Sequence, residues 1–472
     1  MKAGPVRESF LHSALADEPL ARFDAWFAER GAAHPFRVRR LPFSELRQWR
    51  FEPGAGGLAH ESGKFFQVRG LRVRTNHGPV REWDQPIINQ PEIGILGIAT
   101  RVVDGVRRFL MQAKMEPGNV NMLQLSPTVQ ATRSNYTRVH GGRRPQYLDL
   151  FTDRGASAIL VDQLQSEQGA RFLRKRNRNM IIDVKGEVEP HDDFHWLTLA
   201  QIHRLLRADN IVNMDARTVL ACASVRADSS SLPAGDPSAF SVAGRRLEGF
   251  AKDLLLSLSN DEPGLHSMDD LVSWLSEMKS RAEMSIETVP LEELRGWRRT
   301  GDEIRHESGR HFSVIAVEVE AGSREVVSWT QPLLRHYSHG LAGFLAQKIG
   351  GRLHFLARAS VEPGNFDVAD VGPTVALAGS EDGSWETPGP PFLERFLAAP
   401  PAAIRYSAVQ SEEGGRFYHF QNRYMIVEVP PSEVVPLPDD YVWMTLAQLD
   451  ELTRFGMVNI EARNLLACLS LT

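Results

Sequence analysis

Residues 116–119 read Glu-Pro-Gly-Asn, and the same four residues return at 362–365, about 246 positions later. Repetition at a fixed period is the signature of a duplicated structural unit. The same spacing relates His-Glu-Ser-Gly at 60–63 and 306–309, Trp-x-Gln-Pro at 83–86 and 329–332, Pro-Thr-Val at 127–129 and 373–375, Gln-Ser-Glu at 165–167 and 410–412, and Thr-Leu-Ala-Gln at 198–201 and 445–448. The chain is therefore two copies of one unit, from about 20 to 225 and from about 269 to 472.

The length of 472 residues is too great for one hydrophobic core, because domains contain on the order of 150 residues. Residues 227–237 are small, polar and proline-containing, which is typical of a linker. We expect a first repeat with N-terminal helices over 1–226, a linker over 227–240 and a second repeat over 241–472.

Each copy predicts an α+β unit, in which strands are followed by packed helices. A helix carries Trp26 in the first copy and Trp274 in the second, and residues 244–258 form another. Asp104-Gly105 is a hairpin turn pair, and Thr198 a helix cap. Both cysteines, Cys222 and Cys468, fit the apolar pattern of a closing helix and are expected in the core. The first copy predicts strands over 65–74, over a run ending at Trp83, and over 95–103, 108–114, 121–131, 158–165 and 180–184, then helices over 199–207 and 215–223.

The composition excludes several classes of protein. Apolar residues make up 42% and charged residues 24%, with a net charge of −5, so no basic footprint for nucleic acid exists. No run approaches the roughly 18 apolar residues of a membrane helix, and the N-terminus lacks the apolar core of a secretory signal. Two cysteines are too few for a disulfide framework or a cysteine-based zinc site. We expect a cytoplasmic protein.

The two copies differ most at one polar region, which makes the first copy the expected working site. Lys114 and Gln130 are replaced by Ser360 and Ala376, and residues 134–142 have no counterpart in the second copy. Arg and Lys neutralise phosphate, and amide and hydroxyl side chains recognise hydroxyl groups. The region therefore predicts a polar ligand that carries phosphate and hydroxyls. The second copy is expected to be a degenerate pocket or a structural partner.

The runs at 112–119, 124–142 and 83–86, with the duplicated architecture, resemble the NDP-hexose 2,3-dehydratases. This resemblance implies two tandem Nudix-like α/β/α sandwich modules. It implies the substrate dTDP-4-keto-6-deoxy-D-glucose, which loses the C2 hydroxyl and the C3 hydrogen as water to give a 3,4-diketo sugar. It further implies a separate 3-ketoreductase acting next, a role in making the deoxysugars of antibiotics, and a homodimer.

Such a reaction needs a base near C3, a donor to the C4 oxygen and an acid for the departing hydroxyl. The substrate ketone is the electron sink, so we expect no redox cofactor. The sequence also lacks a Gly-x-Gly-x-x-Gly fingerprint in a βαβ context. The candidate catalytic residues are Lys114, Glu116, Tyr136 and His140. For each an ordinary role is the alternative: a turn carboxylate for Glu116, a buried tyrosine for Tyr136, an exposed loop histidine for His140 and a phosphate contact for Lys114.

The candidate substrate-binding residues combine amide, hydroxyl, aromatic and charged side chains. Six of them, Trp83, Gln85, Asn119, Thr128, Glu167 and Arg178, recur in the second copy, so a role in folding is the alternative for these. The full candidate set is Trp83, Gln85, Asn119, Gln124, Thr128, Gln130, Thr132, Asn135, Arg138, Glu167 and Arg178.

Two rival functions remain open. A Nudix-type NDP-sugar hydrolase would need an Arg-Glu-x-x-Glu-Glu cluster for magnesium; neither copy has one, and Asp215 and Glu461 are interpreted as isolated carboxylates on the closing helices. A noncatalytic nucleotide-sugar binding protein would have the same pocket without a base. We expect no metal site.

Overall fold

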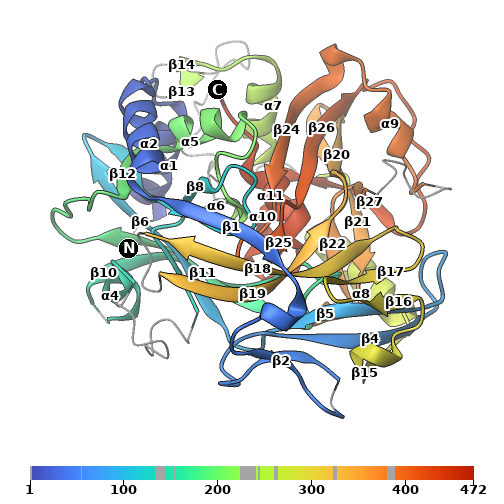
Figure 1. Cartoon of the computed structure of the whole chain (residues 1–472). Helices are drawn as coiled ribbons and strands as arrows, with labels where there is room; N and C mark the ends of the chain where they lie inside the picture. The colour runs from blue at the N-terminus through green and yellow to red at the C-terminus, as the bar shows by residue number, and fades with distance from the viewer. Residues whose placement is uncertain are drawn as a thin grey trace.

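Each half of the chain builds one seven-stranded mixed sheet, with helices packed against it (Figure 1). The computed structural model describes residues 3–54, 56–132, 145–153, 155–223, 241–242, 245–259, 264–322, 327–379 and 389–472. The first sheet has the order β10-β11-β6-β7-β12, with β8 on β7 and β9 on β6. The second repeats it as β24-β26-β20-β21-β27, with β22 on β21 and β23 on β20. The α+β prediction is confirmed.

The first half contains α1 (Ala3–Leu15), α2 (Ala21–Ala33), β1 (Phe36–Leu41), β2 (Trp49–Phe51), β3 (Leu58–His60), β4 (Gln67–Thr75), β5 (Glu82–Asn89), β6 (Gly94–Val103), β7 (Val106–Met115), β8 (Leu123–Ser126), β9 (Val129–Ala131), α4 (Leu148–Thr152), β10 (Ser157–Ser166), β11 (Arg176–Val184), β12 (Phe194–Thr198), α5 (Leu199–Leu206) and α6 (Met214–Ala221).

The second half contains β13 (Ser241–Val242), β14 (Arg245–Arg246), α7 (Gly249–Ser257), α8 (Met268–Arg281), β15 (Met284–Val289), β16 (Trp297–Arg299), β17 (Glu303–His306), β18 (Phe312–Ala321), β19 (Ser328–His336), β20 (Gly340–Ile349), β21 (Arg352–Val361), β22 (Ala369–Gly372), β23 (Val375–Leu377), α9 (Leu393–Leu397), β24 (Ile404–Ser411), β25 (Phe417–Tyr418), β26 (Gln421–Val429), β27 (Tyr441–Thr445), α10 (Leu446–Arg454) and α11 (Ile460–Ala467).

The two halves exchange strands, which the sequence did not predict. β1 leaves its own half and pairs antiparallel with β18, while β15 pairs antiparallel with β4. Figure 1 shows the blue β1 beside β18 and the yellow β15 beside the blue β4. Each smaller sheet therefore contains a strand from the other half, and the repeats are interlocked.

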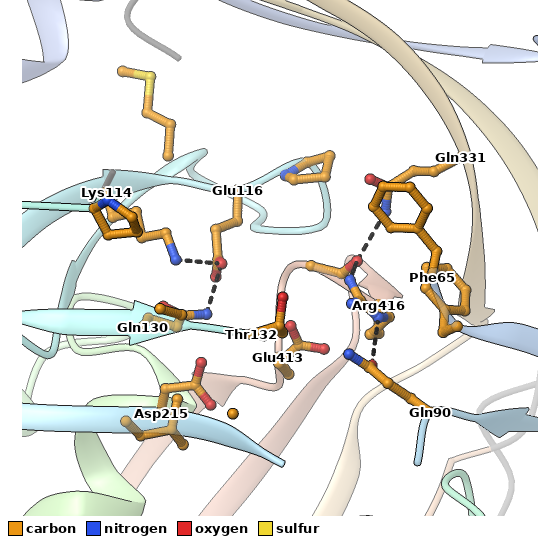
Figure 2. Close-up of a pocket in the computed structure, with 18 of the residues that line it drawn as sticks. Phe65, Gln90, Lys114, Glu116, Gln130, Thr132, Asp215, Gln331, Glu413 and Arg416 are labelled. Atoms are coloured by element: carbon orange, nitrogen blue, oxygen red, sulfur yellow. Dashed lines mark hydrogen bonds and ion pairs between the residues drawn. The ribbon is translucent and has the colours of Figure 1, made fainter. Parts of the chain in front are cut away.

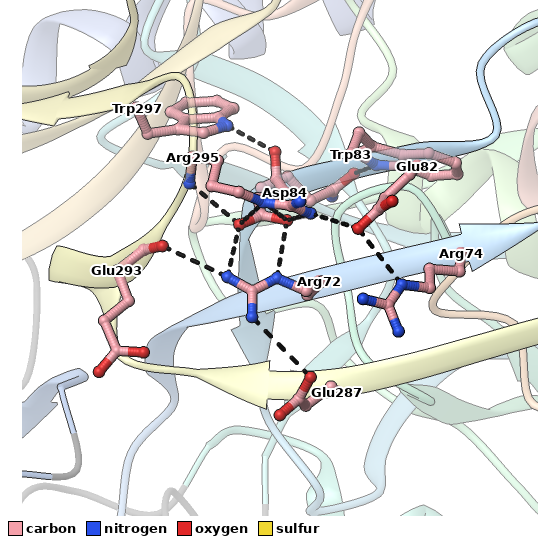
Figure 3. A network of polar contacts seen from close by, with 10 residues as sticks. Arg72, Arg74, Glu82, Trp83, Asp84, Glu287, Glu293, Arg295 and Trp297 are labelled. Carbon is pink, nitrogen blue, oxygen red and sulfur yellow. Dashed lines mark hydrogen bonds and ion pairs between the residues drawn. The ribbon is translucent and has the colours of Figure 1, made fainter.

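A polar network fixes one of these exchanges (Figure 3). The buried carboxylate of Asp84 on β5 accepts hydrogen bonds from Arg72 on β4 and from Arg295 of the second half, whose Nη2 lies 2.7 Å from Oδ1. Burial alone would raise the pKa of Asp84, but the hydrogen bonds from Arg295 and Arg72 lower it to about 2. Trp297 Nε1 also donates to the Asp84 carbonyl at 2.6 Å. The Trp-Asp-Gln-Pro motif thus joins the two halves.

Buried arginines join the halves again at the centre. Arg217 on α6 donates to the carbonyl of Ser411 at 2.7 Å, and Arg463 on α11 donates reciprocally to the carbonyl of Ser166 at 2.5 Å. Both guanidinium groups are fully buried. Because each half supplies the same contact to the other, the joint has approximate twofold symmetry. In addition, one hydrophobic cluster spans both halves.

Several local predictions are confirmed. Trp26 lies on α2 and Trp274 on α8. The turn at Asp104 and Gly105 has positive φ at both residues, as the hairpin prediction requires. Thr198 caps α5 in a capping box with Gln201. The two cysteines are buried and unbonded.

Other local predictions need correction. The second run does not end at Trp83: β5 begins one residue earlier, because Gly78 and Pro79 extend the loop before it. Residues 121–131 form two strands rather than one, with Pro127 between them. In the segment 244–258 the helix starts only at Gly249. The predicted linker over 227–240 lies outside the described residues. None of the described helices is long and apolar enough to cross a membrane.

Candidate active site

A cavity of about 570 Å³ opens where the two halves meet (Figure 2). The first half supplies residues 112–117 at the end of β7, residues 128–132 along β9, and Asp215 from α6. The second half supplies residues 328–331 from β19 and the loop residues Glu413, Gly415 and Arg416. The site is therefore composite, and neither repeat forms it alone.

An ion pair lies on one wall. Lys114 Nζ is 3.2 Å from Glu116 Oε1, and the Gln130 amide donates to the same oxygen at 2.9 Å. Residues on one face of a strand are two apart, so Lys114 and Glu116 at the end of β7 point to the same side. The second half keeps the glutamate as Glu362 but replaces Lys114 and Gln130 with Ser360 and Ala376.

Two further carboxyl groups face this wall from different directions (Figure 2). Asp215 is only 4% exposed. Burial raises the pKa of Asp215 well above its ordinary range, and the negative charges of Glu413, Glu167 and Glu116 raise it further. Desolvation raises the pKa of Glu413 to about 7, although the positive charge of Arg416 opposes the shift. Burial and the neighbouring charges therefore favour the protonated form of Asp215, and Glu413, with a pKa of about 7, can be present in either form near neutral pH.

Glu167 lies deeper and is already engaged. Asn177 Nδ2 donates to its Oε1 at 2.6 Å. Burial raises the pKa of Glu167, and the neighbouring charges of Lys175 and Arg463 oppose that shift. Desolvation lowers the pKa of Lys175 in turn. Lys175 thus adds one more cation to the cavity lining.

The cavity continues toward a cationic and aromatic end. Arg416 Nε donates to Gln90 Oε1 at 3.2 Å, and its guanidinium lies 4.2 Å from the Phe66 ring centroid. Gln331 of β19 fixes this loop by donating to the Gly415 carbonyl at 2.8 Å. His60 and Phe65 line the same end, with ring centroids 4.4 Å apart. In Figure 2 Phe65 lies on the far side of Arg416 from Lys114.

The corresponding place in the second half is filled by aromatic rings. Lys175 and Phe420 are equivalent, because the carbonyl of Lys175 accepts from Glu167 N and that of Phe420 from Glu412 N. The ring of Phe420 stacks on His336 at 3.5 Å, and Arg171 Nε donates to that histidine at 3.2 Å. Phe420, His336 and Arg171 are the equivalents of Lys175, Gln90 and Arg416. In this second place the three side chains contact one another.

The structure places six of the predicted residues in the cavity lining: Lys114, Glu116, Thr128, Gln130, Thr132 and Glu167. Thr128 serves the fold as well, since its hydroxyl donates to the Leu110 carbonyl and accepts from Ala99 N. Four predicted residues lie outside the described part of the chain: Asn135, Tyr136, Arg138 and His140.

Five predicted binding residues lie outside the cavity lining and bond to protein. Trp83 Nε1 donates to Gln85, whose amide donates to the Ala170 carbonyl. Asn119 donates to the Met122 carbonyl, and Gln124 accepts from Ser411. Arg178 forms a two-point ion pair with Asp162. A direct ligand contact of Trp83, Gln85, Asn119, Gln124 or Arg178 stays a prediction.

Sequence reasoning missed much of the lining, including the charged residues Lys175, Asp215, Glu413 and Arg416. The interpretation of Asp215 as an isolated carboxylate was wrong, because α6 brings it beside Glu413, Glu167 and Glu116. A signal existed for two of them: Glu413 aligns with Gln168 and Lys175 with Phe420, so both are polar differences between the copies. Among the described residues no group of three His, Cys, Asp or Glu side chains is arranged to hold a metal ion.

Comparison with known proteins agrees with this architecture. The sequence model of the NDP-hexose 2,3-dehydratase family matches residues 20–223 and again 268–469, one match for each half. The chain belongs to the NDP-hexose 2,3-dehydratase family. Relatives in this family named dTDP-4-dehydro-6-deoxy-alpha-D-glucopyranose 2,3-dehydratase occur in Saccharopolyspora spinosa, Streptomyces violaceoruber and Amycolatopsis orientalis.

These relatives resemble the chain over nearly its whole length. The S. spinosa protein is 47% identical over 96% of this chain and 91% of its own length. The S. violaceoruber protein is 46% identical over 95% and 96%, and the A. orientalis protein 44% identical over 94% and 89%. The dehydratase family therefore has the duplication as a shared feature, and both halves of the composite cavity fall within the matched regions.

Proposed function

We propose that this chain is a dTDP-4-keto-6-deoxy-D-glucose 2,3-dehydratase, a hydro-lyase of deoxysugar biosynthesis. It removes the C3 proton and the C2 hydroxyl and gives a 3,4-diketo-2,6-dideoxy sugar. The observation that carries the proposal is the composite cavity, which combines Lys114 and several carboxyl groups with the cations Lys175 and Arg416. The full-length similarity to three proteins named for this reaction supports it.

The cavity suits both parts of such a substrate. A proton on C3 is acidic because its removal delocalises charge onto the C4 ketone. Lys114, oriented by Glu116, stabilises that oxygen as it becomes negative, and one such donor contributes on the order of 3 kcal/mol. Arg416 and Lys175 bind the diphosphate, and the aromatic end at Phe65 and His60 receives the base. Positioned acids and bases add about 10²–10⁴-fold in rate.

The remaining features follow from the family. We propose that each half is a Nudix-like α/β/α module, bounded at 1–226 and 241–472, and that the enzyme is a cytoplasmic homodimer without redox cofactor or metal. A separate 3-ketoreductase consumes its unstable product. Asn135, Tyr136, Arg138 and His140 stay candidates for substrate contact, because the second half lacks their segment.

The test is incubation with dTDP-4-keto-6-deoxy-D-glucose in D₂O, with a 3-ketoreductase and NADPH to trap the product. We expect a 2,6-dideoxy nucleotide sugar with one deuterium at C2. The Lys114→Met variant should lose at least about 10²-fold in kcat, as expected for a lost oxyanion donor. Ser360→Met, the matched change in the other half, should retain activity.

Each rival predicts a different result in the same tube. A nucleotide-sugar hydrolase would release dTMP and a sugar phosphate in a magnesium-dependent reaction. A noncatalytic binding protein would return the substrate without deuterium at C2. Either result would refute the dehydratase proposal.

A further inference from the structure

We propose that Glu413 and Asp215, one from each half, are the proton-transferring pair of the dehydration. Glu413 removes the C3 proton, and Asp215 protonates the departing C2 hydroxyl. This inference rests on the proposed function and deepens it, since it assigns the two chemical steps to side chains outside the 112–142 region.

Asp215 and Glu413 both line the cavity and are less engaged than its other carboxylates. Glu116 is engaged by Lys114 and Gln130, and one oxygen of Glu167 by Asn177. Among the described residues, no side chain forms a hydrogen bond or ion pair with the Asp215 or Glu413 carboxyl. Glu413 Oε2 is buried without a partner, as is the second oxygen of Glu167. A buried carboxyl oxygen without a partner carries a cost in folding, and a ligand in the cavity would supply that partner.

The surroundings set the two protonation states apart. Glu413 faces Arg416 from its own loop, Lys114 and Glu116 from β7, Glu167 from the β10–β11 connection and Asp215 from α6. Asp215 faces Glu413, Glu167 and Glu116, and the charge of Lys114 opposes them. This environment leaves Glu413 ionisable near neutral pH and favours the protonated form of Asp215. Neighbouring carboxyls with separated proton affinities are the usual acid and base assignments.

The protons and electrons balance over the cycle. The C3–H bond breaks, its proton passes to Glu413, and its electron pair forms the enolate of the C4 ketone. That pair then forms the C2=C3 bond as the C4 carbonyl returns; the C2–O bond breaks, and Asp215 supplies the proton that makes the leaving group water. The proton on Glu413 exchanges with solvent; Glu413 next protonates C2 while Asp215 takes the proton of the C3 enol. The 3,4-diketone is formed, and both carboxyls regain their starting states.

The second half provides the contrast that the proposal requires. In the converse place, which pairs the wall of the second half with the loop of the first, Gln168 occupies the position of Glu413 and donates to Glu412 at 2.6 Å, so an amide stands where the proposed base would be. Glu461 occupies the position of Asp215 on α11. The substitution Glu461→Gln is therefore a matched control for Asp215→Asn.

The experiment separates proton removal from elimination. Full-length wild type, Glu413→Gln, Asp215→Asn and Glu461→Gln are incubated in D₂O with dTDP-4-keto-6-deoxy-D-glucose. Deuterium at C3 of recovered substrate reports proton removal, and the reductase-coupled assay reports elimination. We expect Glu413→Gln to lose both by at least 10²-fold, and Asp215→Asn to lose elimination by 10²-fold while it still exchanges C3. Glu461→Gln should retain both, and dTDP should bind all four proteins within about threefold by calorimetry. Glu413→Asp should recover part of the exchange.

The outcomes are decisive in both directions. Exchange at the wild-type rate by Glu413→Gln, or an equal loss of exchange and elimination in Asp215→Asn, overturns the assignment while the dehydratase function stands. A wild-type protein that neither exchanges C3 nor eliminates water overturns the proposed function, and this inference with it.

Discussion

The substitution Glu413→Gln should make the protein more stable at alkaline pH while it removes activity. Folding raises the pKa of this carboxyl from 4.5 to about 7. A tenfold change in proton affinity corresponds to about 1.4 kcal/mol, so ionised Glu413 costs the folded state at most about 3 kcal/mol. The carboxyl opens onto the cavity, where water reduces the cost, so we expect a gain of about 1–3 kcal/mol.

The sign follows from proton binding. Below pH 4.5 Glu413 is neutral in both states, and an isosteric amide changes little. Between pH 4.5 and 7 the unfolded chain releases the proton while the folded protein keeps it, so stability falls as the pH rises. Above pH 7 the penalty is complete. The amide cannot ionise and avoids this loss.

The measurement is urea unfolding of wild type and Glu413→Gln at pH 4 and pH 8. The stability difference between the two proteins should be under about 0.5 kcal/mol at pH 4 and should grow to about 1–3 kcal/mol in favour of the variant at pH 8. The exposed Glu187 provides the control Glu187→Gln, which should show no such growth. An equal difference at both pH values would refute the reasoning about Glu413.

Three further predictions concern the joint between the halves and the cavity. Arg463→Met leaves buried main-chain carbonyls without a donor and should lower the free energy of unfolding in urea by about 3–5 kcal/mol; a loss under 1 kcal/mol would contradict this. Gly118→Ala places a Cβ 1.5 Å from a carbonyl oxygen of the other half and should sharply reduce the yield of folded protein, whereas Gly301→Ala, with open space around it, should not. Lys175→Phe introduces the ring that fills the second half and should weaken dTDP binding by calorimetry at least tenfold, with an unchanged unfolding midpoint; unchanged affinity would show that Lys175 does not contact the nucleotide.

The predictable part of this fold was local or repeated. The hairpin at Asp104 and Gly105 and the cap at Thr198 depend on side chains within a few residues of each other. Their chemistry can therefore be recognised from the sequence alone. The duplication was also visible, because two copies of one motif need no structural knowledge to align.

The strand exchange could not be predicted in the same way. β1 pairs with β18, which lies some 280 residues further along the chain, and its neighbours in sequence belong to a different sheet. Its residues Phe36–Leu41 alternate in burial as any half-covered strand does. Periodicity identifies such a strand but does not say which edge it joins.

The composite cavity followed from that long-range joint. Glu116 and Lys114 were found because they lie in a conspicuous polar run, but Glu413 and Arg416 are close to them only after the halves interlock. Glu413 is also a polar difference between the copies, because the first half has Gln168 at the equivalent position.

The interlocked twofold joint accounts for why one working cavity needs both halves. Reciprocal contacts such as those of Arg217 and Arg463 require that each half present its loop to the cavity wall of the other. Duplication therefore creates two equivalent places, each with a wall from one repeat and a loop from the other. Substitutions then make the two places different. The place formed by the wall of the first half and the loop of the second has Lys114 and Glu413. The place formed by the wall of the second half and the loop of the first has Ser360 and Gln168 instead. The first half can lose its loop and the second half its wall without loss of the working cavity, so the two repeats are free to diverge only in opposite parts.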